Sequence, residues 1–297
     1  MSQQKILVTG ASGKLGQQVV SYLLEDFKLA PGQLIVTSRR AESLQHLAAK
    51  GVEVREADLS QPDSLVAAFE GADKLLLISI DASGPRTQAH LNAVEAAQGA
   101  GVKHISYTSM PEALQSPLVF AHEHQATEKA IMQSGIASAT ILRNNWYFEN
   151  LPEYFASIFQ TGFWLTSSGL GQVAELSRQD LAYAAAASLM HESQGKHTLS
   201  LNGVESLTHE QMAKQIDEVL GTSIQVVQLS DEDYQAKLES FELPKAIVYL
   251  CVTMDEHNRA GHSDGDSTDF EALTGKKPMS FKAWLEANKT QLQNLVK

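Results

Sequence analysis

Three glycines, spaced three residues apart, follow a short apolar stretch near the start of the chain. Ile6-Leu7-Val8 predicts a buried strand, Gly10, Gly13 and Gly16 follow it, and apolar residues then recur at helical spacing over residues 19–24. In dinucleotide-binding folds one glycine permits the tight turn, a second lets the backbone approach the pyrophosphate, and a third lets the helix lie close to the sheet. The amides at the helix N-terminus then face the phosphates. The stretch therefore predicts a dinucleotide site, and the alternative is a glycine-rich turn without a ligand.

Apolar stretches alternate with amphipathic ones over the first half of the chain. Further strands are expected at residues 34–37, 52–54, 74–80, 102–107 and 138–142, and helices at 41–50, 62–69, 87–100 and from about 120 onward. Strands that alternate with helices indicate a parallel sheet with helices on both faces. We predict an α/β protein, a Rossmann-type doubly wound parallel sheet with a smaller C-terminal α/β lobe. Residues 1–150 would form the NAD(P)-binding domain, with a returning segment near 172–200, and residues 151–297 mainly the substrate-covering lobe.

The composition excludes several classes of partner. The 297-residue chain has a net charge of −12, whereas surfaces that bind nucleic acids or anionic membranes are basic. The longest apolar stretches, residues 181–190 and 246–254, are far shorter than the roughly 20 residues of a membrane span. The polar first residues, followed at once by a strand, do not resemble a signal peptide, and Cys251 is the single cysteine. We expect a cytoplasmic protein, and the oligomeric state, a homodimer among the alternatives, stays open.

Two arginines follow the second expected strand, where this fold places the adenosine ribose. An acidic residue there would bind a 2′-hydroxyl, whereas an arginine accommodates a 2′-phosphate. Arg39 and Arg40 therefore favour NADPH over NADH, with Lys14 as a second charge on the phosphate. The alternative is that both arginines are solvated loop charges. Asp58, after the third strand, either accepts a hydrogen bond from the adenine amino group or caps a turn.

Polar and aromatic side chains follow the sixth expected strand, where the nicotinamide ring should lie. They are Asn144, Asn145, Trp146, Tyr147, Phe148 and Glu149. An asparagine amide can hydrogen-bond a carboxamide or a ribose, and flat aromatic rings can form a slot for a flat substrate. The alternative is that the three aromatic rings plug a seam between two lobes, and both interpretations can hold. The fourth strand ends at Ser79, Ile80 and Asp81, which we expect near the nicotinamide ribose.

The positions that carry the proton donor in ordinary short-chain reductases differ here. In those enzymes a serine closes the fifth strand, and a Tyr-x-x-x-Lys follows on the next helix. Ser109 stands at the serine position, but an alignment on residues 127–129 puts Phe120 at the tyrosine and His124 at the lysine. Phenylalanine has no proton to donate, so alcohol and sugar carbonyl chemistry is not expected. His124 either replaces the lysine against the ribose or is a partly buried helix histidine.

A metal site is not expected at this helix. His122 and His124 are two residues apart, which turns them about 200° from each other on a helix. No matching cysteine or third histidine is close in the sequence, and His122 is expected at the surface.

Several of these segments resemble the NmrA-like atypical short-chain dehydrogenases. The matching segments are residues 10–16, 75–79, 107–109, 116–118, 123–129 and 142–150, and more loosely 269–278. Within that family the chain is similar to bacterial NADPH-dependent quinone reductases, with reductases of triphenylmethane dyes as near relatives.

The resemblance implies roles for individual residues. The pyrophosphate would lie against Gly10, Ala11, Ser12, Gly13, Lys14 and Leu15, and the 2′-phosphate against Arg39. Ser79 and its neighbours would line the ribose and nicotinamide, and residues 144–149 would form the nicotinamide and substrate wall. Asn145 departs from the family, which typically carries glycine there, so its side chain would narrow the slot. Residues 177–180 resemble the family's loop that returns to the active site, and the alternative is a helix cap.

The pattern is weaker after residue 150. Helices are expected at residues 151–159, 181–190, 208–220, 231–238, 244–254 and 281–295, and strands at 198–201 and 224–229. Residues 162–171 are expected to form a loop. Residues 257–267 hold aspartates and histidines, but their order matches no calcium loop, so a flexible lid or surface loop is expected.

These observations favour NADPH-dependent reduction of quinones. The hydride would pass directly to a quinone stacked over the nicotinamide, and water would protonate the hydroquinone anion, so a protein acid is not needed. The protein would supply stacking and orientation. The alternatives are an NADP(H)-binding redox sensor and a reductase of other flat electrophiles, such as triarylmethane dyes.

Overall fold

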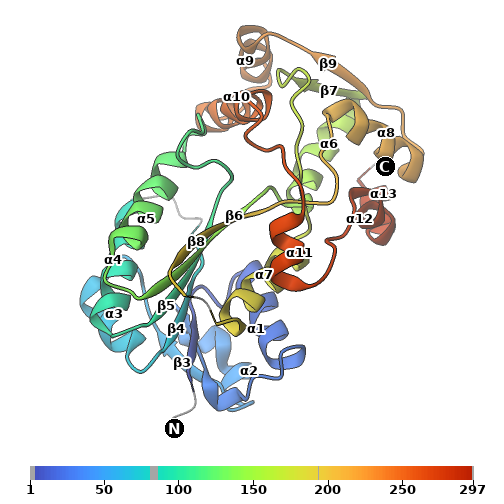
Figure 1. Cartoon of the computed structure of the whole chain (residues 1–297). Coiled ribbons are helices and arrows are strands. Elements are labelled where there is room, and N and C mark those ends of the chain that lie inside the picture. The colour runs from blue at the N-terminus through green and yellow to red at the C-terminus, as the bar shows by residue number, and fades with distance from the viewer. Residues whose placement is uncertain (1–3, 81–85, 193, 296–297) are drawn as a thin grey trace. The chain divides into compact units, whose positions relative to one another are not determined.

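The chain divides into two compact units. The computed structural model describes residues 4–80, 86–192 and 194–295 (Figure 1). The first unit comprises Met1–Met110, His122–Asn144 and Leu181–Leu199, and the second unit comprises Pro111–Ala121, Asn145–Asp180 and Ser200–Lys297. The chain thus leaves the first unit and returns to it before the C-terminal third.

A sheet of seven strands forms the first unit, in the order β3-β2-β1-β4-β5-β6-β8. These are β1 (Ile6–Val8), β2 (Leu34–Ser38), β3 (Glu53–Glu56), β4 (Lys74–Leu77), β5 (His104–Ser109), β6 (Ser138–Asn144) and β8 (Lys196–Leu201). Neighbouring strands from β3 to β6 pair in parallel, with Leu7 opposite both Ile35 and Leu75. Strand order reverses between β1 and β4, and ligands of such sheets bind beyond the carboxyl ends of the strands at this point.

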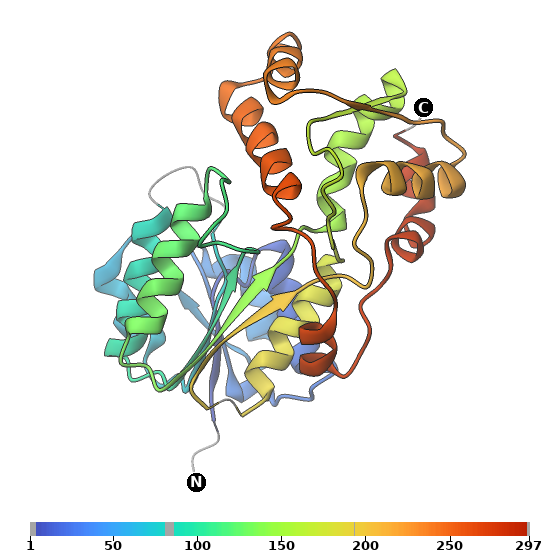
Figure 2. The same cartoon turned by 45° about the horizontal axis from the view of Figure 1, so that its top comes forward.

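Helices cover both faces of this sheet. Leu65, Phe69, Val94 and Ile131 of one set of helices share a core with the strands, and these helices are α3 (Pro62–Phe69), α4 (Arg86–Gly99) and α5 (Ala121–Gln133). On the other face lie α1 (Lys14–Glu25) and α7 (Arg178–Met190) (Figures 1 and 2). The short helix α2 (Gln45–Ala48) follows two 3-10 turns, η1 (Pro31–Gln33) and η2 (Ala41–Leu44). The predicted doubly wound α/β fold is confirmed.

The second unit has a core of its own. Phe155, Ile216, Trp284 and Leu285 are buried together, and a smaller cluster forms around Tyr234 and Val248. Its elements are η3 (Phe148–Asn150), α6 (Leu151–Thr161), β7 (Phe163–Thr166), α8 (His209–Leu220), β9 (Gln225–Gln228), α9 (Asp231–Glu239), α10 (Lys245–Arg259), α11 (Thr268–Thr274), α12 (Phe281–Ala287) and α13 (Lys289–Gln293). Strands β7 and β9 pair in parallel.

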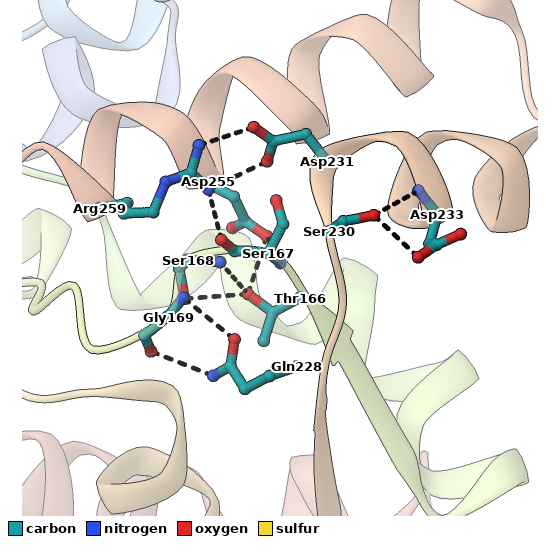
Figure 3. A network of polar contacts seen from close by, with 10 residues as sticks. All are labelled: Thr166, Ser167, Ser168, Gly169, Gln228, Ser230, Asp231, Asp233, Asp255 and Arg259. Carbon is teal, nitrogen blue, oxygen red and sulfur yellow. Dashed lines mark hydrogen bonds and ion pairs between the residues drawn. The ribbon is translucent and has the colours of Figure 1, made fainter.

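A polar network joins β7 to helices α9 and α10 (Figure 3). The buried carboxylate of Asp255 accepts hydrogen bonds from the Thr166 hydroxyl at 2.8 Å and the Ser167 amide at 2.6 Å. The Arg259 guanidinium binds both oxygens of Asp231, at 2.9 and 2.7 Å. Both Asp255 and Arg259 lie on α10, which ends at Arg259. The helix predicted from hydrophobicity ended at residue 254, before both of these residues.

Three expectations for the second unit were wrong at least in part. Residues 162–171 are not all loop, because Phe163–Thr166 forms β7 against a strand distant in sequence. Residues 257–267 were expected to form a flexible lid or surface loop; 257–259 instead end α10, and His257 and Ser263 are fully buried, although 259–261 are exposed. The last helix breaks at Asn288 into α12 and α13. The strand pairing of β7 and the burial of polar residues depend on tertiary contacts, which the local sequence pattern does not show. Within the described residues, no helix has the length and apolar character of a membrane span.

Candidate functional site

Helix α1 is packed directly onto the glycine loop. Gly10 has a φ of +62°, and the Ala11 amide donates to the Thr37 carbonyl at 3.1 Å, which holds the loop at the end of β2. A Cβ on Gly16 would lie 2.3 Å from the Gly10 carbonyl oxygen and 2.8 Å from the Ala11 Cα. Only glycine fits at that crossing, as the helix-packing role of the third glycine requires.

The N-terminus of α1 is open to solvent. Ser12, Gly13 and Lys14 are exposed. Within the described chain, Gly13 gives the helix no side-chain cap and the first turn holds no acidic residue. Unpaired amides and the positive end of the helix dipole favour an anion here. The loop can therefore hold a phosphate group.

Exposed cations lie at the carboxyl end of β2. Arg39 and Arg40 are both exposed, and the Ser38 hydroxyl accepts the Arg40 amide at 3.2 Å and lies 3.1 Å from the Ser12 hydroxyl. Asp58 accepts the amide and the hydroxyl of Ser60, at 2.9 and 2.8 Å, and these bonds together with the charge of Arg39 lower its pKa. Asp58 therefore caps a turn, as one of the two predictions for this residue stated. The other, a hydrogen bond from the adenine amino group, stays a prediction.

The chain beyond β4 is fixed by buried hydroxyl and imidazole groups. The Ser79 amide donates to the Thr108 hydroxyl at 2.8 Å, and the Ile80 amide donates to His90 Nε2 at 3.1 Å. Since Nε2 accepts, His90 is neutral and carries its proton on Nδ1, which lies 3.2 Å from the Thr127 hydroxyl. Ser79 and Ile80 are half-buried at the switch point of the sheet. Asp81 lies outside the described residues.

His124 is buried in the first unit. Its Nδ1 shares a 2.8 Å hydrogen bond with the Tyr107 hydroxyl, and the side chain is 4% exposed. Burial, with smaller contributions from the charges of Arg86 and His90, lowers its pKa to about 3. A neutral imidazole does not supply the positive charge of the lysine it would replace, so its role beside the ribose stays a prediction. His122 is exposed, as expected. The described residues hold no cluster of three metal-ligating side chains.

The serine at the end of β5 is bound to a buried ion pair. The Ser109 hydroxyl donates to Glu128 Oε1 at 2.6 Å, and Arg143 binds both oxygens of Glu128, at 3.1 and 3.0 Å. Glu128 and Arg143 are almost fully buried. This ion pair was not predicted from the sequence. The sequence shows only that a glutamate on α5 and an arginine on the following strand β6 have opposite charges.

The buried amide of Asn144 has no hydrogen-bond partner in the described part of the chain. Asn144 closes β6, is 7% exposed, and neither its side-chain oxygen nor its nitrogen has a hydrogen bond within the described residues. An unpaired buried polar group costs about 1–3 kcal/mol, and native proteins rarely leave one unsatisfied. Both atoms therefore point to a ligand with a donor and an acceptor, such as a carboxamide.

Asn145 is bonded within the second unit. Its nitrogen donates to Asn202 Oδ1 and to the Ser263 carbonyl, both at 2.8 Å, and its oxygen accepts the Trp146 amide at 2.8 Å. The side chain is 1% exposed. Asn145 thus fixes the backbone of Trp146, and its effect on the width of the slot stays a prediction.

The three aromatic residues after it have different environments. Phe148 is 2% exposed and packs against Phe281 and Trp284 in the core of the second unit. Trp146 and Tyr147 are half-buried. The Phe120 ring meets Trp146 edge-on at 6.3 Å, a contact that sequence analysis did not identify. Trp146 and Tyr147 therefore keep part of their ring surface exposed, whereas Phe148 does not.

A guanidinium lies against the Tyr147 ring. The Arg178 guanidinium lies over the Tyr147 ring, 5.4 Å from its centroid, and the Arg178 amide donates to Glu149 Oε2 at 2.9 Å. Burial, and secondarily the charge of Glu149, raises the pKa of Glu175 to about 8. Ser177 and Asp180 form the cap of α7, because the Asp180 amide donates to the Ser177 hydroxyl at 3.0 Å. A return of this loop to the active site stays a prediction.

Comparison with known proteins identifies relatives of this chain. The NmrA-like family model matches residues 2–285. Quinone oxidoreductase 2 of Escherichia coli is 35% identical over 270 residues, which are 91% of this chain and 93% of that protein. The crystal structure of the E. coli NADPH-dependent quinone oxidoreductase QOR2 with NADPH aligns with a TM-score of 0.88 at 34% identity, over 95% of this chain and 99% of that one. Triphenylmethane reductase of Citrobacter sp. with NADP(H) aligns with a TM-score of 0.85 at 33% identity, over 97% and 100%.

The residues of the first unit fit a phosphorylated dinucleotide. Residues 12–14 at the start of α1 are exposed and suit a pyrophosphate, and the arginines after β2 suit a 2′-phosphate. The Asn144 amide, unpaired within the described residues, suits a carboxamide.

Proposed function

The chain belongs to the NmrA-like family, and we propose that it is an NADPH-dependent reductase whose acceptors are quinones. One observation carries the choice of acceptor. The usual proton-donor set of short-chain reductases is missing, since Phe120 has no acidic proton and Ser109 is held by the buried carboxylate of Glu128. An acceptor that needs no protein acid at the moment of transfer suits this site.

The first unit would hold the cofactor. Backbone amides of the loop from Gly10 to Leu15 would bind the pyrophosphate, Arg39 the 2′-phosphate, and the Asn144 side chain the carboxamide. NADPH, when bound, supplies a hydride. Ser79 and Ile80, fixed by Thr108 and His90, would line the ribose.

The second unit would hold the acceptor by stacking. Trp146 and Tyr147 present half-buried aromatic rings, and Asn145 fixes the backbone of Trp146. The quinone gains two electrons and one proton as a hydride, and the hydroquinone anion takes a second proton from water. The side chains therefore contribute orientation and exclusion of water rather than proton transfer.

The purified protein with NADPH and 1,4-benzoquinone tests the proposal. We expect NADPH absorbance to fall faster than in a protein-free control, with formation of one hydroquinone per NADPH. A protein that binds NADPH tightly but gives no turnover above the control would contradict the reductase and support a redox sensor.

Triphenylmethane dyes are a second class of acceptor. The similarity to the Citrobacter triphenylmethane reductase over nearly the whole chain supports it, and a dye cation also gains a hydride without needing a proton. Comparing kcat/KM for crystal violet and benzoquinone in one preparation would rank the two classes.

A further inference from the structure

Arg178 lies on the aromatic surface of the second unit. It is the first residue of α7, its side chain is half-buried, and its guanidinium carbon is 5.4 Å from the centroid of the Tyr147 ring. Cation–π contact of this kind holds a guanidinium against the face of a ring. The contact fixes the position of the charge without using its hydrogen-bond donors.

These donors have no partner within the described part of the chain. A guanidinium carries five N–H groups, and neither a hydrogen bond nor an ion pair engages those of Arg178 among residues 4–80, 86–192 and 194–295. By contrast, Arg143 and Arg259 bind Glu128 and Asp231 through their guanidinium groups. Arg178 therefore differs from these arginines in having its fork of donors available.

The neighbouring carboxylates bind other groups. Glu149 accepts the Arg178 backbone amide at 2.9 Å. Asp180 accepts the Ser177 hydroxyl at 2.6 Å and the Met279 amide at 3.0 Å. Burial raises the pKa of Glu175 to about 8, so it is largely protonated at pH 7 and adds little negative charge. Among the described residues, none of these carboxylates forms an ion pair with the Arg178 guanidinium.

We propose that Arg178 selects acceptors that carry an anionic group, a sulfonate or a carboxylate, beside their flat ring. This inference rests on the proposed quinone reductase function. The planar fork of a guanidinium matches two oxygens of such a group, while the ring of the acceptor would lie against Trp146 and Tyr147. Arg178 would then be a specificity residue that contacts the substituent, not the reacting atoms.

The test compares two acceptors that differ by one charge. They are 1,4-naphthoquinone and 1,4-naphthoquinone-2-sulfonate, which stays anionic at every working pH. In Arg178→Gln we expect kcat/KM for the sulfonate to fall about tenfold, as loss of one charge-assisted contact would give, and kcat/KM for the neutral quinone to change less than about twofold. Arg178→Lys, which keeps the charge, should retain most of the preference.

A matched control separates this contact from the effect of net charge. Lys282→Gln removes one positive charge from the same unit, at an exposed ion pair with Glu218. It should leave the ratio of the two kcat/KM values unchanged. Added salt should weaken the sulfonate preference of the natural protein and have little effect on the ratio in Arg178→Gln, since screening acts on charge pairs.

Two kinds of failure are distinguishable. If the natural protein reduces neither quinone, the proposed function fails and the inference fails with it. If it reduces both but Arg178→Gln lowers them equally, or lowers neither, the function stands and the guanidinium does not contact the acceptor's charge. NADPH affinity of each variant, measured by fluorescence titration, shows whether the first unit is intact.

Discussion

Asn144 and Arg178 both have side-chain donors that bind no group within the described residues. Most buried polar groups are paired, as with Ser109, Asn145 and Asp255. Asn144 has no partner for either side-chain atom in the described residues, and the Arg178 guanidinium contacts only an aromatic ring there. A buried polar group without a partner calls for an explanation such as a bound ligand, and the proposals above assign Asn144 to the cofactor and Arg178 to the acceptor.

Arg39 should decide the choice of cofactor. We expect Arg39→Ala to raise the Kd for NADPH at least about tenfold, because a charge-assisted bond to the 2′-phosphate is lost. The Kd for NADH, which lacks that phosphate, should change little. Fluorescence titration with both nucleotides measures the difference. The neighbouring exposed arginine provides a matched control as Arg40→Ala, and equal weakening of NADPH and NADH by Arg39→Ala would remove this role.

At the scale of elements, α1 crosses the glycine loop at Gly16, where a Cβ would come closer to other atoms than at any other described glycine of the first unit. The Gly10 carbonyl and the Ala11 Cα leave no room for a Cβ at Gly16. Helix α1 is therefore in direct contact with the loop, and the position of the loop amides depends on how closely the helix lies on the strand ends.

Gly16→Ala should accordingly damage both stability and binding. Relief of a 2.3 Å contact with backbone atoms requires a shift of α1, and overpacking of this kind costs about 1–3 kcal/mol of the free energy of unfolding. We expect a lower urea midpoint and little or no NADPH binding. Gly99→Ala is the matched control, because a Cβ at that helical glycine meets nothing closer than 3.6 Å. Normal NADPH affinity in Gly16→Ala would show that the crossing does not shape the loop.

At the scale of the whole molecule, buried histidines make both units sensitive to acid. Burial lowers the pKa of His90 and His104 to about 4, and that of His124 and His257 to about 3. An unfolded histidine has a pKa near 6.5, so the unfolded chain binds more protons below that pH. The stabilisation is complete above pH 6.5 and is lost as the pH falls toward 4. Glu175, with a pKa raised to about 8, acts oppositely, since folding stability falls as the pH rises from 4.5 to 8.

His104 allows this pH dependence to be measured away from the site. Its two ring nitrogens bond to Ser138 and Ser106 at 2.9 and 3.1 Å. Between pH 6 and pH 4.5, the free energy of unfolding of the natural protein should fall as the pH is lowered. In His104→Gln we expect this fall to be smaller by about 1.4 kcal/mol per pH unit. Urea denaturation at several pH values measures these slopes. His122→Gln, at an exposed histidine, should leave the slope unchanged, and an unchanged slope in His104→Gln would contradict the assignment.

The sequence by itself determined the first unit and the family. Short apolar runs separated by amphipathic helices predict parallel strands, and the glycine spacing predicts the turn, because both depend on neighbours in the chain. The arginines after β2 and the phenylalanine at the tyrosine position, Phe120, can also be read directly from the sequence. The second unit was less predictable, since β7 depends on pairing with the distant β9.

Only the tertiary structure decided which of the predicted site residues remain available to a ligand. Phe148 lies in a core, Ser109 is bound by Glu128, and Asn145 is bonded to Asn202, whereas Asn144 has no partner in the described chain. The position of Arg178 over Tyr147 likewise follows from the folding of the second unit. The physical reason is that a residue's type fixes which bonds it can make, but its partners come from segments far away in the sequence, and folding brings them together.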